Sequence, residues 1–249
     1  AGGVLTNIPG LMPATTAIPA VGTGSPNALT VTIGAGGAGE SGPTNPTPSQ
    51  PGADTTMSGP GPISLTAVGG GGASATNAGP YGGQPGGSGG GARVGRSPLS
   101  GGTGTTGQGN PGGDSSGGGG GAGAAGDATA PAPSDGHGGI GVQLPPAFRD
   151  PKSSIGAPGP GGTKYWVAGG GGGGYYDGKG GSWDGSALIP GGPYAGAGGG
   201  TPAPSSPAVG GSGTQNTGGG GGGAHGQSIP NNDRGGSGGS GLVLIAYPT

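Results

Sequence analysis

The sequence predicts a non-helical fold: a polyglycine-II helix bundle or sandwich with a few short β-strands and long polar loops. Three observations lead to this fold class. Glycine accounts for 79 of the 249 residues and proline for 28, large aliphatic side chains are scarce, and the glycines gather in runs between polar spacers. An interior glycine costs a helix about 1 kcal/mol and a proline about 3 kcal/mol. We therefore expect essentially no α-helix and no conventional side-chain core.

A composition this rich in glycine and proline is often disordered, but the charge content argues for order. Disordered chains usually combine low hydrophobicity with high net charge. Here seven basic and nine acidic residues give a net charge of −2, so charge repulsion does not keep the chain expanded. The same balance argues against a nucleic-acid surface, which needs a basic stripe. No run of about 20 apolar residues occurs, so membrane insertion is not expected.

Short apolar stretches that join glycine runs are the predicted strands. Alternating apolar and β-branched residues enter a run in "ALTVTIGAGGAG" (28–39), "ISLTAVGGGG" (63–72) and "TKYWVAGGGGGG" (163–174). The order is reversed in "GGSGGSGLVLIAYPT" (235–249), where the run comes first. Period-two alternation is typical of half-buried strands. These stretches predict four strands, residues 138–144 predict a weaker fifth, and the proline- and serine-rich spacers between them predict loops.

The glycine runs are predicted to form ordered rods. A polyproline-II-type helix has three residues per turn and no internal hydrogen bonds, so it must bond to neighbours to be stable. Only glycine lets several backbones approach closely enough for this. Because glycine loses the most conformational entropy on folding, the apolar stretches are expected to anchor the runs as a small hydrophobic base. The predicted anchors are Leu29, Val31, Ile33, Ile63, Leu65, Tyr165, Val167, Leu242, Leu244 and Ile245.

The combination of these stretches with "TGQGNPGGDSSGGGGGAGAAG" (106–126), "TGGGGGGAHG" (217–226) and the ending "GLVLIAYPT" resembles the glycine-rich domain of phage tail proteins. The pattern is also similar to the tail-tip adhesins of T-even-like phages, in which polyglycine-II helices form a sandwich whose loops bind the host. The resemblance covers most of the chain. It implies a virion or extracellular location and a homo-oligomer. It also implies contact with a host cell-surface protein or glycan and with other virion or fibre subunits.

The aromatic residues after the six glycines at 169–174 are the candidates for receptor contact. Tyrosine and tryptophan in glycine- and serine-rich loops supply rigid contact area at a low entropic cost, and nearby charges add hydrogen bonding. The candidate loop residues are Tyr175, Tyr176, Asp177, Lys179, Trp183, Asp184, Tyr194 and Tyr81. Phe148 is a weaker candidate of the same kind. The alternative is structural, with these rings capping the open ends of the bundle or packing between subunits. Of Tyr165 and Trp166, one is expected to face the apolar base.

No enzyme, cofactor or metal site is expected. The chain has no cysteine, and its two histidines, His137 and His225, lie far apart in glycine-rich surroundings. The segment "GGYYDGK" (173–179) begins like a phosphate-binding loop, but glycine follows the lysine where that motif has serine or threonine. No nucleophile, base and orienting residue form a recognisable catalytic set.

The sequence as a whole favours a non-enzymatic virion component, a phage tail-fibre tip or adhesin that contacts the host through variable loops. The alternative is a structural subunit of a virion decoration or an extracellular fibre. We expect a single glycine-rich domain over residues 1–249. Because neither an initiator methionine nor a signal-peptide pattern is present, the chain is expected either to be processed or to be a fragment, and in the second case the C-terminal part of a longer protein.

Overall fold

The computed structural model describes residues 1–13, 28–39, 49–73, 82–92, 100–115, 117–128, 136–174, 194–200, 209–224 and 234–246, and the backbone of residues 182 and 183. This part of the chain contains no α-helix, which confirms the prediction. Two short 3₁₀ helices, η1 (Pro146–Phe148) and η2 (Pro160–Gly162), each begin with proline. The strands are β1 (Thr30–Thr32), β2 (Thr55–Ser58), β3 (Ser64–Ala67), β4 (Gly138–Gly139), β5 (Val142–Gln143), β6 (Trp166–Val167) and β7 (Ser182–Trp183).

Strands β1, β2 and β3 form an antiparallel sheet in which β2 is central. Val31 lies opposite Met57, and Met57 lies opposite Leu65. Strands β1 and β3 fall within the predicted apolar stretches. Strand β2 was not predicted, because its residues belong to a spacer rich in proline and glycine. The β-branched residues Thr55 and Thr56 nevertheless suit a strand, and the two flanking strands supply the partners that it needs.

The other strands form two-stranded pairs. β5 pairs antiparallel with β6, with Val142 opposite Val167, and β4 pairs parallel with β7. The predicted strands in 163–174 and 138–144 are therefore present in short form. The last predicted strand, at residues 242–245, is not a strand in the structure. Its side chains Leu242 and Leu244 pack against the apolar cluster, and this packing takes the place of pairing with a neighbouring strand.

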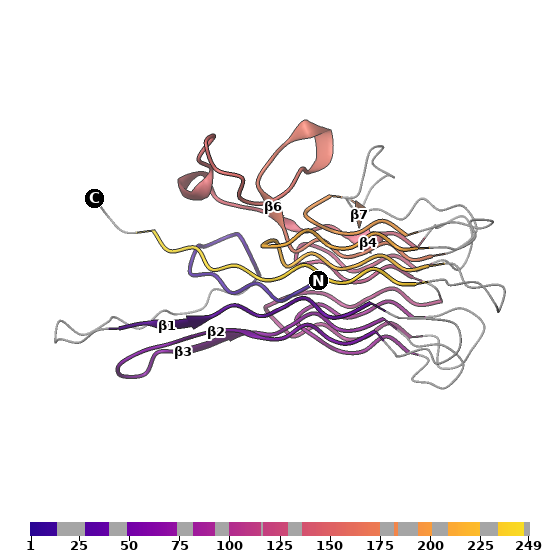
Figure 1. Cartoon of the computed structure of the whole chain (residues 1–249), viewed down its shortest axis with the longest axis horizontal. Coiled ribbons are helices and arrows are strands. Elements are labelled where there is room, and N and C mark those ends of the chain that lie inside the picture. Colours follow the sequence, from indigo (N-terminus) through magenta and orange to yellow (C-terminus); the bar gives the residue numbers. More distant parts are fainter. Residues whose placement is uncertain are drawn as a thin grey trace.

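The glycine runs bond to several neighbours at once, with a repeat of three residues. Around the run at 168–173, four segments accept or donate hydrogen bonds: 119–122, 136–139, 195–198 and 220–223. The N–H groups of Gly170 and Gly173 donate to the carbonyls of Gly139 and Gly136, at 2.8 and 2.7 Å. A repeat of three differs from the period of two in a β-strand. Figure 1 shows the runs as wavy traces that lie side by side along the longest axis.

Close approach of backbones explains why these positions are glycine. A Cβ atom on Gly138 would overlap the carbonyl oxygen of Gly170, and one on Gly171 would overlap the carbonyl oxygen of Gly221. Such neighbours are backbone atoms, which cannot rotate away as a side chain can. Any larger residue would therefore separate the two runs and break the hydrogen bonds between them.

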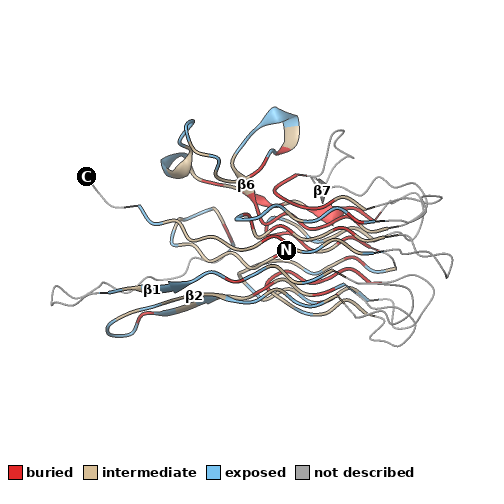
Figure 2. Cartoon of the chain, in the orientation of Figure 1, coloured by how far each residue is buried: buried red, intermediate tan, exposed pale blue. Residues whose placement is uncertain are grey.

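Non-glycine residues in outer runs occupy every third position and face outward. Ala35 and Ala38 are exposed, whereas the glycines between and before them are at least partly buried. Ser237 and Ser240 repeat the spacing in the run that pairs with this one, and Ser237 is exposed. The exposed alanines in the run at 34–39 thus lie three residues apart. Figure 2 shows the resulting mixture of buried and exposed residues along single runs.

One apolar cluster lies beside the bundle. Its buried members are Ala1, Met12, Ala122, Val142, Leu144, Val167 and Ala168, and Tyr165, Leu242 and Leu244 are among the partly buried residues that pack against it. The backbone nitrogen of Ala1 donates to the carbonyl of Gly120 at 3.1 Å, so the first residues lie between other runs. The cluster thus joins the two ends of the described chain to its middle.

Polar side chains complete hydrogen bonding where runs end or change direction. The carboxylate of Asp54 accepts from the N–H of Gly69 at 2.8 Å, and the Gln108 amide accepts from the N–H of Val68 at 2.9 Å. The Asn110 amide donates to the carbonyls of Gly121 and Ala122, both at 3.0 Å. At the edges of the bundle, where no further run is available, these side chains supply the missing hydrogen-bond partners of the backbone.

Candidate binding surfaces

Most of the predicted receptor-contact residues lie outside the described residues. This holds for Tyr81, Tyr175, Tyr176, Asp177, Lys179 and Asp184. For Trp183 the structure gives the backbone, which pairs with Gly139 through β7 and β4. The structure therefore neither brings these residues together nor separates them.

Tyr194 differs from the prediction. It was expected in an exposed loop, but only 7% of it is exposed. It begins a tight turn in which the N–H of Ala197 donates to its carbonyl at 2.9 Å. The following Ala195, with φ of 54°, donates its N–H to the carbonyl of Pro158 at 2.9 Å. This bond holds the turn against the segment that contains Pro158. A ring enclosed in this way is not available to a partner.

The predicted apolar anchors divide into two groups. Tyr165, Val167, Leu242 and Leu244 lie in or against the apolar cluster, Ile63 is buried outside it, and Leu29 and Leu65 are half-buried. Val31, Ile33 and Ile245 differ from the prediction, because they are exposed by 39%, 44% and 46%. The physical reason is that β1 is an edge strand covered on neither face, and that Ile245 lies beyond the cluster contacts of Leu244.

Residues 144–166 form a lobe that rises from the bundle, as Figure 1 shows around β6. The lobe returns to the bundle through Tyr165, whose φ of 67° lies in the left-handed region that side chains rarely adopt. Leu144 donates its N–H to the Tyr165 carbonyl at 2.8 Å, which closes the base of the lobe. The strained residue therefore marks the point where the chain changes from lobe to glycine run.

Trp166 occupies the outward face at the base of this lobe. Its neighbours in β5 and β6, Val142 and Val167, are buried in the cluster, and alternation along a strand places Trp166 and Gln143 on the opposite face. The indole N–H donates to the Thr163 hydroxyl at 2.9 Å. The sequence left open which aromatic faces the base; Tyr165 packs against the cluster, and Trp166 faces away from it.

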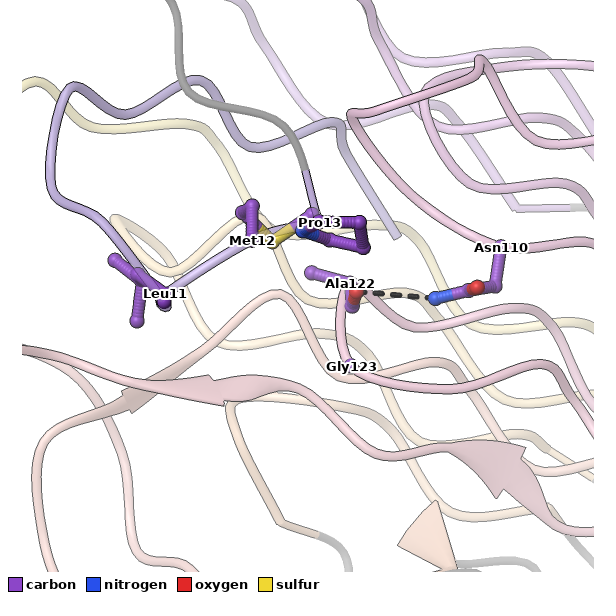
Figure 3. A pocket seen from close by; sticks show the side chains of 7 residues that line it. Leu11, Met12, Pro13, Asn110, Ala122 and Gly123 are labelled. Atoms are coloured by element: carbon purple, nitrogen blue, oxygen red, sulfur yellow. Dashed lines mark hydrogen bonds between the residues drawn. The ribbon is translucent and has the colours of Figure 1, made fainter.

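A shallow groove of about 500 Å³ lies beside the apolar cluster, and Figure 3 shows its lining. The groove is lined by Gly10, Leu11, Met12, Pro13, Asn110, Ala122 and Gly123. Both amide hydrogens of Asn110 are already used by backbone carbonyls. The groove thus has a lining of mixed polarity, and Asn110 acts there as a structural residue.

The described residues contain no cluster of metal-ligating side chains. No group of three or more histidine, cysteine, aspartate or glutamate residues there is placed to hold a metal ion. His137 is buried, with 3% exposed, beside the glycines of β4. In the same residues, no helix has the length and apolar character needed to cross a lipid bilayer.

The chain belongs to the glycine-rich domain family, whose family model matches residues 1–248. The match spans both the glycine runs and the lobe at 144–166. No curated protein and no solved structure matches the chain. The family match leaves the partner open, and its assignment depends on the surfaces described above.

Proposed function

We propose that this protein is a non-enzymatic adhesion component, a phage tail-fibre tip or adhesin that contacts a host cell-surface protein or glycan. In this proposal the glycine runs pack as polyglycine-II helices and serve as a rigid scaffold. The three-residue repeat of hydrogen bonds around 168–173 supports this packing, because a polyglycine-II helix has three residues per turn.

The observation that carries the proposal is that several runs end next to one another. Gly173 donates to Gly136 at 2.7 Å, and Gly223 donates to Gly172 at 2.7 Å. A Cβ on Gly200 would overlap the carbonyl of Gly173. The described ends of these runs therefore lie together at one end of the bundle. Clustering of sequence-variable segments on a rigid scaffold is how many binding proteins build a recognition surface.

A second candidate function is that of a structural subunit in a virion decoration or an extracellular fibre. It is favoured by the exposed Val31 of β1, an edge strand that carries no charge, and by the exposed Ile33 that follows the strand. Unprotected edge strands are common sites of association between chains. Under this alternative, β1 lies at a contact between subunits, and a homo-oligomer is extended rather than closed.

The assembly state of the purified full chain separates the two functions. Light scattering and electron microscopy of one sample should show monomers or small closed oligomers if the protein is an adhesin. Long regular filaments would instead favour the fibre subunit and contradict the adhesin.

Attachment of the labelled chain to bacterial cells then tests the loops. The triple variant Tyr175→Ala, Tyr176→Ala and Trp183→Ala should lose attachment. A matched triple variant in another polar spacer, Thr201→Ala, Ser205→Ala and Ser206→Ala, should retain it. Equal attachment by both variants would show that the aromatic segment is not the contact surface.

A further inference from the structure

We infer that Trp166 and Lys164 form a binding site for an acidic glycan on the outward face of the lobe. This inference rests on the proposed adhesive function and names its partner as a sugar polymer that carries carboxylate groups. The site differs from the loop candidates at 175–184, because it lies in the described residues at the opposite end of the run at 168–174.

The indole of Trp166 is held in place before any ligand arrives. Its backbone N–H and C=O both bond to Ala157, at 3.0 and 2.8 Å, and Gln143 of β5 lies opposite it on the other side. The ring packs directly over Gly159, where a Cβ would overlap the indole atoms. The Nε1–H bond to Thr163 then fixes its rotation.

The support under the ring is itself hydrogen-bonded. The Thr163 hydroxyl donates to the Pro160 carbonyl at 2.6 Å, and Gly159 donates its N–H to the Thr163 carbonyl at 2.9 Å. Helix η2 and Gly159 therefore form a fixed base for the indole. An aromatic ring that is already ordered loses little entropy on binding, which favours affinity.

The exposed surface of this ring suits the apolar face of a sugar. Trp166 is only partly buried, and its single donor is already bonded to Thr163, so a ligand would contact it through the apolar indole surface. The electron-rich face of an aromatic ring attracts positively polarised hydrogens, such as the ring C–H groups of a pyranose. Gln143 donates its amide to the Lys164 carbonyl at 2.9 Å, which leaves the amide oxygen to accept from a sugar hydroxyl.

The exposed Lys164 selects an acidic sugar, on a lobe that is itself positively charged. Residues 144–166 carry Arg149, Lys152 and Lys164 against a single acid, Asp150, in a chain whose net charge is −2. Lys164 is exposed, and within the described residues no ion pair involves it. Lys164 lies two residues from the indole in the sequence and shares the Gln143 contact. A carboxylate on a stacked sugar would pair with this ammonium group.

Binding of polygalacturonate to the full-length chain tests the inference, with dextran as the neutral polymer. The wild type should bind polygalacturonate at least tenfold more tightly than dextran, and binding should weaken as salt is raised. Trp166→Ala should lower the affinity for polygalacturonate at least tenfold. Trp166→Phe, which keeps a ring, should retain part of it.

Lys164→Gln supplies a second variant, because its side chain is exposed and its loss does not disturb the packing over Gly159. This variant should lose most of the preference for polygalacturonate over dextran, whereas Lys152→Gln is the matched control and should keep it. Absence of polygalacturonate binding by the wild type, or unchanged binding by both Trp166→Ala and Lys164→Gln, would overturn the inference.

Cell attachment, measured in parallel, separates this inference from the proposed function. Attachment that is lost in the Tyr175, Tyr176 and Trp183 variant, in a protein whose polygalacturonate binding does not depend on Trp166, would overturn the glycan site and support the adhesin. Polygalacturonate binding that depends on Trp166, in a protein that forms filaments and attaches to no cell, would support the site and contradict the adhesin.

Discussion

The glycine bundle and the apolar cluster hold this protein together in different ways. In the bundle, the backbones are in direct contact, and each glycine run forms hydrogen bonds with several neighbouring segments. In the cluster around Val142, Leu144 and Val167, side chains pack as in an ordinary core. The two regions differ in how well they tolerate a change of side-chain size. At contacts such as those of Gly138 and Gly171 the bundle has no room for an added methyl group, whereas the cluster accepts other apolar side chains of similar volume.

The largest effect is expected from an added methyl group inside the bundle. A Cβ on Gly118 would overlap the carbonyl of His137, so Gly118→Ala should lower the free energy of unfolding by about 3 kcal/mol or more. The control is the next residue, Gly119, where the nearest atom to an added Cβ is the nitrogen of Gly171 at 3.6 Å. Gly119→Ala should raise the free energy of unfolding by about 0.4–1 kcal/mol. Urea unfolding measures both, and similar losses in both variants would contradict the packing described.

Side-chain truncation in the cluster should have the next largest effect. Leu144 is buried, with 6% exposed, and Leu144→Ala should cost about 2–3 kcal/mol through lost burial and the cavity that remains. Leu144→Met, which nearly conserves volume, should cost less than about 1.5 kcal/mol. The same unfolding measurement applies. A methionine variant as unstable as the alanine variant would show that the cluster is packed as strictly as the bundle.

Loss of a polar contact at the edge of the bundle should have a moderate effect. Asn110→Ala removes two amide donors from the carbonyls of Gly121 and Ala122, and each bond contributes about 1 kcal/mol. We expect a decrease of about 1–2 kcal/mol in the free energy of unfolding. Hydrogen exchange should quicken mainly in the runs that Asn110 joins. A decrease spread evenly over the whole molecule would argue against this local role.

The smallest expected effect is a gain in stability. Ser88 is fully buried, and within the described residues its hydroxyl has no hydrogen-bond partner. Ser88→Ala removes this unsatisfied group and should raise the free energy of unfolding by about 1 kcal/mol. Ser154→Ala, at an exposed serine, should change it by less than about 0.5 kcal/mol. A destabilised Ser88→Ala variant would indicate that the hydroxyl has a partner in solution.

Local preferences were sufficient to predict much of the fold. The absence of α-helix follows from glycine and proline alone, and the strands β1, β3 and β6 follow from alternating apolar residues next to glycine runs. The spacing of the exposed Ala35 and Ala38 is also visible in the sequence, because the two residues lie three positions apart within one glycine run. It was missed because the runs were considered as uniform glycine.

Other features depend on which segments become neighbours, and single-sequence patterns do not contain that information. Strand β2 exists because β1 and β3 flank it. Tyr194 is buried because its turn meets Pro158, and Gln108 and Asn110 act as caps because particular runs end beside them. For the candidate site, the sequence singled out the aromatics after the run at 169–174. It did not show that Trp166, before the run, is displayed on a prepared support.

The contact between the runs at 34–39 and 234–241 has a consequence for how the molecule folds. Gly238 and Gly241 donate to Gly37 and Gly34, at 2.9 and 3.0 Å, across about 200 residues of intervening chain. Closing so long a loop is entropically costly, and folds dominated by distant contacts form slowly. The carbonyls of Ala35 and Ala38 accept from Ala53 and Gln50, nearby in the sequence. During synthesis, the carbonyls of Gly34 and Gly37 instead stay bonded to water until the last run emerges. Completion of the bundle is therefore expected to be a late and slow step.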